Sequence, residues 1–102
     1  MGISYTIQMD LPQGSKDVHV PVGFAKDKLI KFSFNATQNV AISTNAPTGA
    51  GQEVVPVTIG KPTAWERQSA PFIQNPFSGD VDGLYVTSDK KSRLTLRIEV
   101  DL

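Results

Sequence analysis

The chain has 102 residues, of which 39% are hydrophobic and 20% charged, and these values are typical of a single soluble globular domain. Ten acidic and ten basic residues cancel, so no long-range field would gather nucleic acid or an anionic membrane. The sequence contains no cysteine, which excludes disulfides, thiolate metal sites and cysteine nucleophiles.

The N-terminus lacks a basic stretch followed by an apolar one, and no run approaches the roughly 20 apolar residues of a membrane-spanning helix. We therefore expect no signal peptide, no membrane partner and no membrane span. The sequence does not indicate where the protein is located, and a virion is one of the alternatives.

Both ends of the chain alternate between apolar and polar residues. From Arg93 to Leu102 every second side chain is aliphatic, and from Ile3 to Leu11 the apolar residues again take one face. A period of two residues is that of a strand with one buried face. We expect these two strands in the same core, and consider them as neighbours.

Shorter alternating segments lie between the two ends, and turn residues separate them. Pro21 and Pro56 lack the N–H that a central strand donates, so the strands that contain them are expected at sheet edges. The expected strands are residues 17–22, 28–36, 40–45, 53–60 and 83–87.

Residues 60–83 lack this alternation and contain three prolines and several aromatic residues. Thr63 and Glu66 have the spacing of a capping box, which predicts a short helix from Ala64 to about Ser69, ended by Pro71. Long irregular connections are often functional, so this stretch is expected to carry any specific activity.

The pattern predicts one all-β domain over residues 1–102. We expect an antiparallel β-sandwich of about seven to eight strands with one short helix in a long loop. A jelly roll, an immunoglobulin-like sandwich and a barrel remain alternatives, because the sequence does not fix the strand order.

The candidate partner-binding residues are Trp65, Phe72, Ile73, Phe77 and Tyr85. Aromatic side chains are frequent at interface centres, but they also dominate the burial of cores. The same residues could cap one end of the sandwich, meet a protein partner or another copy, or stack on a sugar ring.

We expect no catalytic residue, metal or cofactor. His19 is interpreted as a solvent-facing strand residue, since nothing nearby in sequence supplies a second ligand or a nucleophile. Asp80 and Asp82 begin like a calcium loop, but the later ligands are missing and an Asp-Gly turn at Gly83 explains them. No spacing rule places two of the carboxylates, such as Glu53, Glu66 and Glu99, across a cleft.

Three short patterns receive structural interpretations. Lys90, Lys91 and Arg93 form a basic cluster that we interpret as a protected hairpin tip, with no nucleic-acid partner. A myristoylation pattern at residues 2–6 reads equally well as strand, and a glycosylation sequon at residues 35–37 lacks a secretion signal.

The first functional hypothesis is a non-enzymatic structural protein, a small subunit of a larger assembly such as a phage or virus particle. A capsid-decorating or minor capsid protein is the specific form of this hypothesis. The alternative is a carbohydrate-binding module in which Trp65 and Tyr85 are stacking platforms. A small hydrolase ranks third, because no nucleophile–base arrangement is visible.

Overall fold

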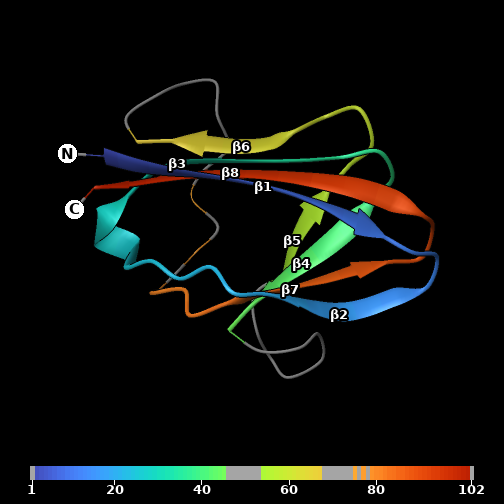
Figure 1. Ribbon diagram of the computed structural model, residues 1–102. Coiled ribbons are helices and arrows are strands. Elements are labelled where there is room, and N and C mark those ends of the chain that lie inside the picture. The colour runs from blue at the N-terminus through green and yellow to red at the C-terminus, as the bar shows by residue number, and fades with distance from the viewer. Residues whose placement is uncertain (1, 46–53, 68–74, 76, 78, 102) are drawn as a thin grey trace.

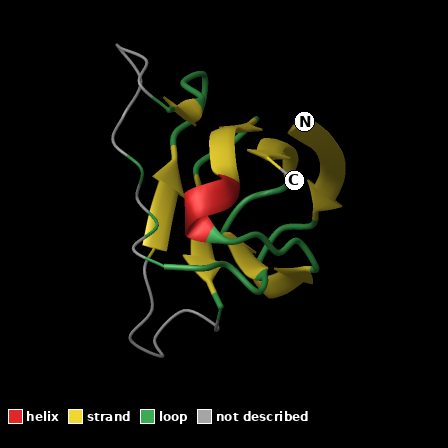
Figure 2. Ribbon diagram, turned by 90° about the vertical axis from the view of Figure 1, so that its left-hand side faces the viewer, coloured by secondary structure: helices red, strands yellow, loops and turns green. Residues whose placement is uncertain are grey.

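The computed structural model describes residues 2–45, 54–67, 75, 77 and 79–101. The described residues form eight strands and one short 3-10 helix, η1, at Lys26–Lys28 (Figures 1 and 2). The strands are β1 (Gly2–Leu11), β2 (Ser15–Val20), β3 (Leu29–Ala36), β4 (Val40–Thr44), β5 (Val54–Val57), β6 (Thr63–Glu66), β7 (Leu84–Ser88) and β8 (Ser92–Asp101).

The strands build two four-stranded antiparallel sheets that pack face to face, which confirms the predicted all-β sandwich. Sheet A has the order β1-β8-β3-β6, and sheet B has the order β2-β7-β4-β5. Successive strands therefore cross between the sheets, except for β4 and β5, which are neighbours in sheet B.

The two terminal strands are neighbours, as considered from the sequence. β1 pairs with β8 along its whole length, from Gly2 opposite Asp101 to Leu11 opposite Ser92. The alternation predicted for β8 is also confirmed, since Leu94, Leu96, Ile98 and Val100 are at most 3% exposed.

The core lies between the sheets, and aromatic rings fill its centre. The rings of Phe32 and Phe34 stack at 5.0 Å between centroids, and Phe77 meets Phe32 edge-on at 5.2 Å and Phe24 at 5.6 Å. Edge-to-face contacts of this kind stabilise a core beyond the area that they bury.

The predicted helix from Ala64 to Ser69 is wrong over its described part, because Thr63–Glu66 is strand β6. Trp65 pairs with Phe32, and the N–H of Arg67 donates to the carbonyl oxygen of Ile30 at 2.9 Å. The Thr63 hydroxyl donates to the carbonyl oxygen of Pro56 at 2.8 Å and does not cap a helix. Pairing with β3 satisfies the backbone groups that a helix would have satisfied, so tertiary context overrides a four-residue pattern.

The buried side chains of β3 do not follow strict alternation at the start of the strand. The ladder to β8 is irregular between Leu29 and Lys31, and this irregularity buries Leu29 completely while Ile30 is only half-buried. An extra residue in a strand shifts which side chains face the core. The expected edge positions hold, because β5 with Pro56 and β2, which ends just before Pro21, are the edge strands of sheet B.

Candidate functional site: the free edge of β1

Strand β1 is an edge strand of sheet A, and no described strand lies along its other side. Antiparallel strands point the N–H and C=O groups of alternate residues to opposite sides. Half of the backbone groups of this ten-residue strand therefore point away from β8 and can pair with another extended chain. Figure 1 shows β1 running along the rim of the sandwich.

The inner side of this edge is apolar and only partly covered. Cross-strand partners share a sheet face, so the β1 residues opposite the four buried side chains of β8 face inward. We call these four residues the β1 inner row: Ile3, Tyr5, Ile7 and Met9. Ile3 and Tyr5 are 39% and 40% exposed, Ile7 and Met9 are half-buried, and only Leu11 at the end of the strand is fully buried.

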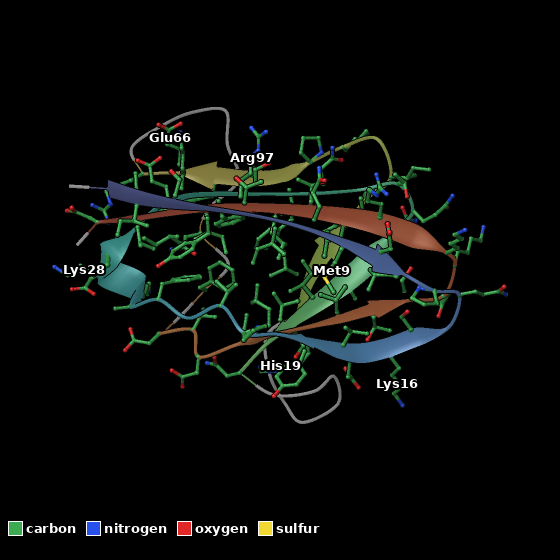
Figure 3. All side chains as sticks on the ribbon, in the orientation of Figure 1. Met9, Lys16, His19, Lys28, Glu66 and Arg97 are labelled. Atoms are coloured by element: carbon green, nitrogen blue, oxygen red, sulfur yellow. The ribbon has the colours of Figure 1, made fainter. Side chains whose placement is uncertain are left out.

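The length of β2 explains this exposure. β1 and β2 leave the same connection at Pro12–Gly14, but β2 has six residues and β1 has ten. Figure 1 shows β1 extending well beyond the end of β2, so sheet B covers the Leu11 end of β1 better than the Ile3 end. In Figure 3, the Met9 side chain points into the space between the two sheets near their connection.

The other three edge strands carry features that hinder pairing with another chain. β5 has four residues and contains Pro56, and β6 has four residues and follows Pro62. β2 has a register irregularity between Ser15 and Val18, where Asp17 has a φ of 50°. Short length, proline and bulges are the usual protections of sheet edges.

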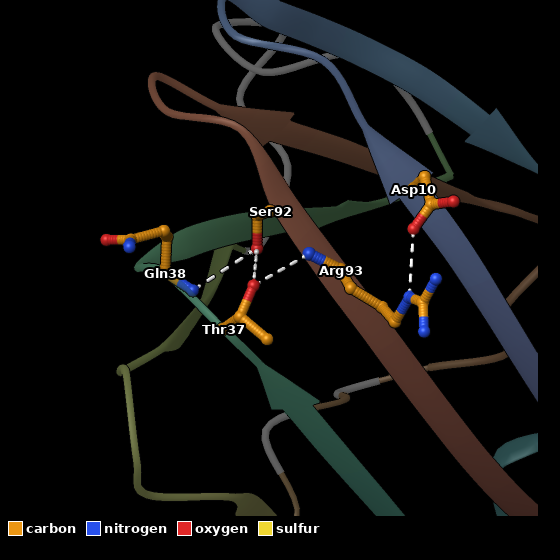
Figure 4. A network of polar contacts seen from close by, with 5 residues as sticks. All are labelled: Asp10, Thr37, Gln38, Ser92 and Arg93. Carbon is orange, nitrogen blue, oxygen red and sulfur yellow. Dashed lines mark hydrogen bonds and ion pairs between the residues drawn. The ribbon is translucent and has the colours of Figure 1, made fainter.

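By contrast, β1 is long, regular in register, and contains no proline, lysine or arginine. Its single charged residue, Asp10, is near its end and accepts a hydrogen bond from the Nε of Arg93 at 2.9 Å (Figure 4). This bond and the guanidinium charge hold the pKa of Asp10 below its ordinary value. The edge of β1 is therefore the most accessible pairing surface of the described sheets.

Arg93 also belongs to the network that fixes this end of β8 (Figure 4). Its backbone N–H donates to the hydroxyl of Thr37 at 2.9 Å, and the N–H of Gln38 donates to the hydroxyl of Ser92 at 3.2 Å. The two hydroxyls lie 3.4 Å apart. These bonds tie the β3–β4 connection to β8, so the neighbour against which β1 lies is held in place.

The outer face of sheet A is hollowed, and charged residues are among those that line the hollow. The hollow has a volume of about 490 Å³ and contains a cross-strand row in which Lys31 lies between Glu99 and Glu66. The Nζ of Lys31 lies 3.3 Å from a carboxylate oxygen of Glu99. Figure 3 shows Glu66 and Arg97 pointing outward from this face.

This row brings together two carboxylates that sequence spacing did not connect. A glycosidase pair needs an open space between its carboxyl groups for a water or a sugar carbon. Here the strand of Lys31 separates Glu66 from Glu99, and its ammonium group pairs with Glu99. The row is better described as cross-strand ion pairing on a solvated face than as an acid–base pair.

The three predicted partner-binding residues that the structure describes do not form one surface. Phe77 is 2% exposed and belongs to the aromatic centre of the core, so its ring is not available to a partner in this chain. Its backbone N–H donates to the side-chain oxygen of Asn75 at 2.9 Å, which holds the chain where the ring enters the core. Phe72 and Ile73 lie outside the described residues.

Trp65 and Tyr85 lie in different sheets. Trp65 is half-buried in β6, and its ring stacks on Phe32 with 6.1 Å between centroids. Tyr85 is half-buried in β7 of sheet B, where its ring lies 5.0 Å from that of His19. The two rings therefore do not make a common stacking platform.

His19 is exposed, as expected, and the aspartates near Gly83 take part in local hydrogen bonds. His19 is exposed on the outer face of sheet B, as Figure 3 shows. Asp80 accepts a hydrogen bond from the N–H of Lys26, and the Asn45 side chain bridges the carbonyl oxygen of Asp80 and the N–H of Asp82. Over the described ranges, no three histidine, aspartate or glutamate side chains gather as metal ligands would.

The basic cluster also follows its structural interpretation in part. Lys90 and Lys91 are exposed at the β7–β8 connection, while Arg93 is engaged by Asp10. Within the part of the chain that the structure describes, no helix has the length and hydropathy to span a bilayer.

Sequence reasoning missed the β1 inner row as a surface. Alternation correctly places Ile3 and Tyr5 on the inward side, but it says nothing about whether a second layer lies beneath them. The available signal was the composition of β1, because a long amphipathic strand without proline or lysine lacks the protection that sheet edges usually have.

Comparisons with known proteins identify no family for this chain. No protein-family model matches the chain, and no curated protein matches it. Among solved structures, the chain is similar to one from work on Bacillus endospore appendages, described there as a novel family of disulfide-linked pili. That match covers 99% of this chain and 88% of the other at a TM-score of 0.45 and 11% identity, values too low to support an argument about this chain.

Proposed function

We propose that this protein is a non-enzymatic structural subunit that joins a larger assembly through the free edge of β1. The observation that carries the proposal is the combination of an unprotected ten-residue edge with a partly uncovered apolar row. Addition of a strand at such an edge supplies main-chain hydrogen bonds, and the apolar row supplies area that loses water on contact.

The specific form of the proposal is a component of a phage or virus particle, such as a capsid-decorating or minor capsid protein. The strand orders β1-β8-β3-β6 and β2-β7-β4-β5 support the jelly-roll alternative among the expected sandwiches. Jelly rolls are used by viral capsid domains, although a fold hosts many functions and this support is an analogy.

Carbohydrate binding is the second candidate, because lectin domains also use jelly rolls and the outer face of sheet A is hollowed. Trp65 borders this hollow together with Lys31 and Glu66, but its ring stacks on the buried ring of Phe32 on the inner side of the sheet, and Tyr85 lies on the other sheet. The candidate therefore rests on Trp65 alone, in the edge strand β6. A glycan array with wild-type protein and Trp65→Ala tests it, and no binding by the wild type ends it.

Sedimentation velocity from micromolar to millimolar concentration tests the structural proposal. The wild type is expected to form species heavier than the 11.1 kDa chain, and Tyr5→Lys is expected to shift it to monomer. Ile59→Lys is the matched control, because Ile59 is a 50% exposed apolar residue that lies outside β1. A wild type that stays monomeric, or association that Tyr5→Lys leaves intact, would contradict the proposal.

A further inference from the structure

We propose that the strand that occupies the free edge of β1 is β1 of a second copy, paired antiparallel about a two-fold axis perpendicular to the sheet. This inference rests on the proposed function and names its partner. Two copies of sheet A would then form one continuous sheet with the two β1 strands at its centre.

The faces of β1 favour its own copy as partner. A two-fold axis perpendicular to a sheet keeps inner faces on the same side, so odd-numbered residues meet odd-numbered residues across the new ladder. The β1 inner rows of the two copies would then meet each other, while Ser4, Thr6 and Gln8 would meet on the outer side. Apolar residues and hydroxyl residues are both favourable as cross-strand neighbours of their own kind.

The charges of β1 favour the same arrangement. The longest overlap of two ten-residue strands places the axis at Thr6 or at Ile7, the two central residues. Asp10 would lie opposite Gly2 of the second copy in the first case and opposite Ser4 in the second. Neither register places like charges face to face, and Asp10 is already paired with Arg93 of its own chain.

The other described edges are poorer partners for β1. Pairing with β6 of another copy would join ten residues to four, next to Pro62, and pairing with β5 would meet Pro56. Each would leave most of the β1 edge uncovered. Self-pairing is the arrangement that uses nearly the whole length of the strand.

A single-cysteine scan tests the inference, because the natural chain has no cysteine and each variant carries one thiol. The scan replaces Ser4, Tyr5, Thr6, Ile7 and Gln8 one at a time. Directly opposite residues of an antiparallel pair are roughly 4.5–5.5 Å apart at Cα, within the roughly 4.4–6.8 Å that a disulfide spans. One place off the axis, a residue and its counterpart are offset by two residues, roughly 7 Å along the strand, in addition to the lateral distance.

The expected result under mild oxidation is a disulfide-linked dimer at one position only, Thr6→Cys or Ile7→Cys, with little at either neighbour. Ile59→Cys, exposed and distant in sequence from β1, gives the background of random collision. Cross-linking at every position along one face would indicate parallel pairing and overturn the inference. Cross-linking at the background level in all five variants would also overturn it.

The cross-linking result separates this inference from the proposed function. If the wild type associates in sedimentation and Tyr5→Lys abolishes the association, but no scan position cross-links, the edge binds another segment and only the two-fold pairing is lost. If the wild type is monomeric throughout, both the proposed function and this inference fail.

Discussion

Tyr5 and Ile98 lie directly opposite each other in the β1–β8 ladder, yet Tyr5 is 40% exposed and Ile98 only 2%. The two side chains share a sheet face and lie one strand apart, so the boundary of the second layer runs between them. The inner side of sheet A is therefore a core face at β8 and a surface at the Ile3 end of β1.

Truncating an isoleucine to alanine should lower the free energy of unfolding more at Ile98, in the core, than at Ile3, at the surface. Ile98→Ala should lower the free energy of unfolding by about 2–5 kcal/mol, because it leaves a cavity in a packed core. Ile3→Ala should lower it by about 1 kcal/mol or less, since its side chain is partly in water. Urea unfolding measures both, in solution dilute enough to keep the chain monomeric. Equal losses would show that the β1 inner row is covered in the isolated chain.

Phe77 should behave as a core residue. Phe77→Ala should cost about 3–5 kcal/mol of unfolding free energy, because the ring packs against Phe24, Phe32 and Phe34. The emission of Trp65, the single tryptophan of the chain, reports on the same region because its ring stacks on Phe32. A stable Phe77→Ala variant with unchanged emission and weakened self-association would instead indicate that Phe77 is a partner-binding residue.

The effect of a β-branched residue at Ala64 on stability distinguishes the strand at Thr63–Glu66 from a helix. Ala64→Val should leave stability unchanged or raise it by a few tenths of a kcal/mol, because β-branched residues suit a half-buried strand. In a helix the same change would lower stability by up to about 0.7 kcal/mol. Thermal unfolding of Ala64→Val beside Ala64→Gly, which is unfavourable in both structures, distinguishes the two cases.

The Asp10–Arg93 pair should be visible in a titration. Arg93→Gln should raise the pKa of Asp10 toward its ordinary value, because the hydrogen bond and the charge of Arg93, the two largest causes of its lowering, are both removed. Since the folded pKa is the lower one, the pair stabilises the fold above the unfolded pKa, and this contribution is lost as the pH falls through the folded pKa.

Carboxyl NMR measures this titration, with Arg97→Gln as the control on the same strand. Arg97 lies opposite Thr6 and should leave Asp10 unaffected. The pair is exposed, so added salt should weaken the effect of Arg93 on Asp10. An Asp10 pKa that is the same with and without Arg93 would contradict the contact.

Period-two alternation was sufficient to predict the fold class, because it records which residues share the apolar face of a strand. It located β1 and β8 within about one residue, and Pro56 correctly indicated an edge strand. At Thr63–Glu66 the alternation is too short to outweigh a capping-box pattern, and the deciding fact is the presence of β3 as a partner, which lies far away in sequence.

The candidate site was not predictable for a related reason. Whether Tyr5 is buried depends on where β2 ends under β1, and the order of strands sets this, not the residues of β1. Aromatic composition suggested a surface at Phe77, but the ring is at the centre of the core. Residue type alone does not separate an interface aromatic from a core aromatic, because both owe their contribution to buried area.

Amide hydrogen exchange along β1, followed residue by residue as the protein concentration is raised, tests the central claim most directly. We predict that alternate amides, those that point away from β8, exchange rapidly in dilute solution and become protected as association proceeds. If those amides stay rapid at every concentration, or if protection develops only on other strands, the free edge of β1 is not the binding surface.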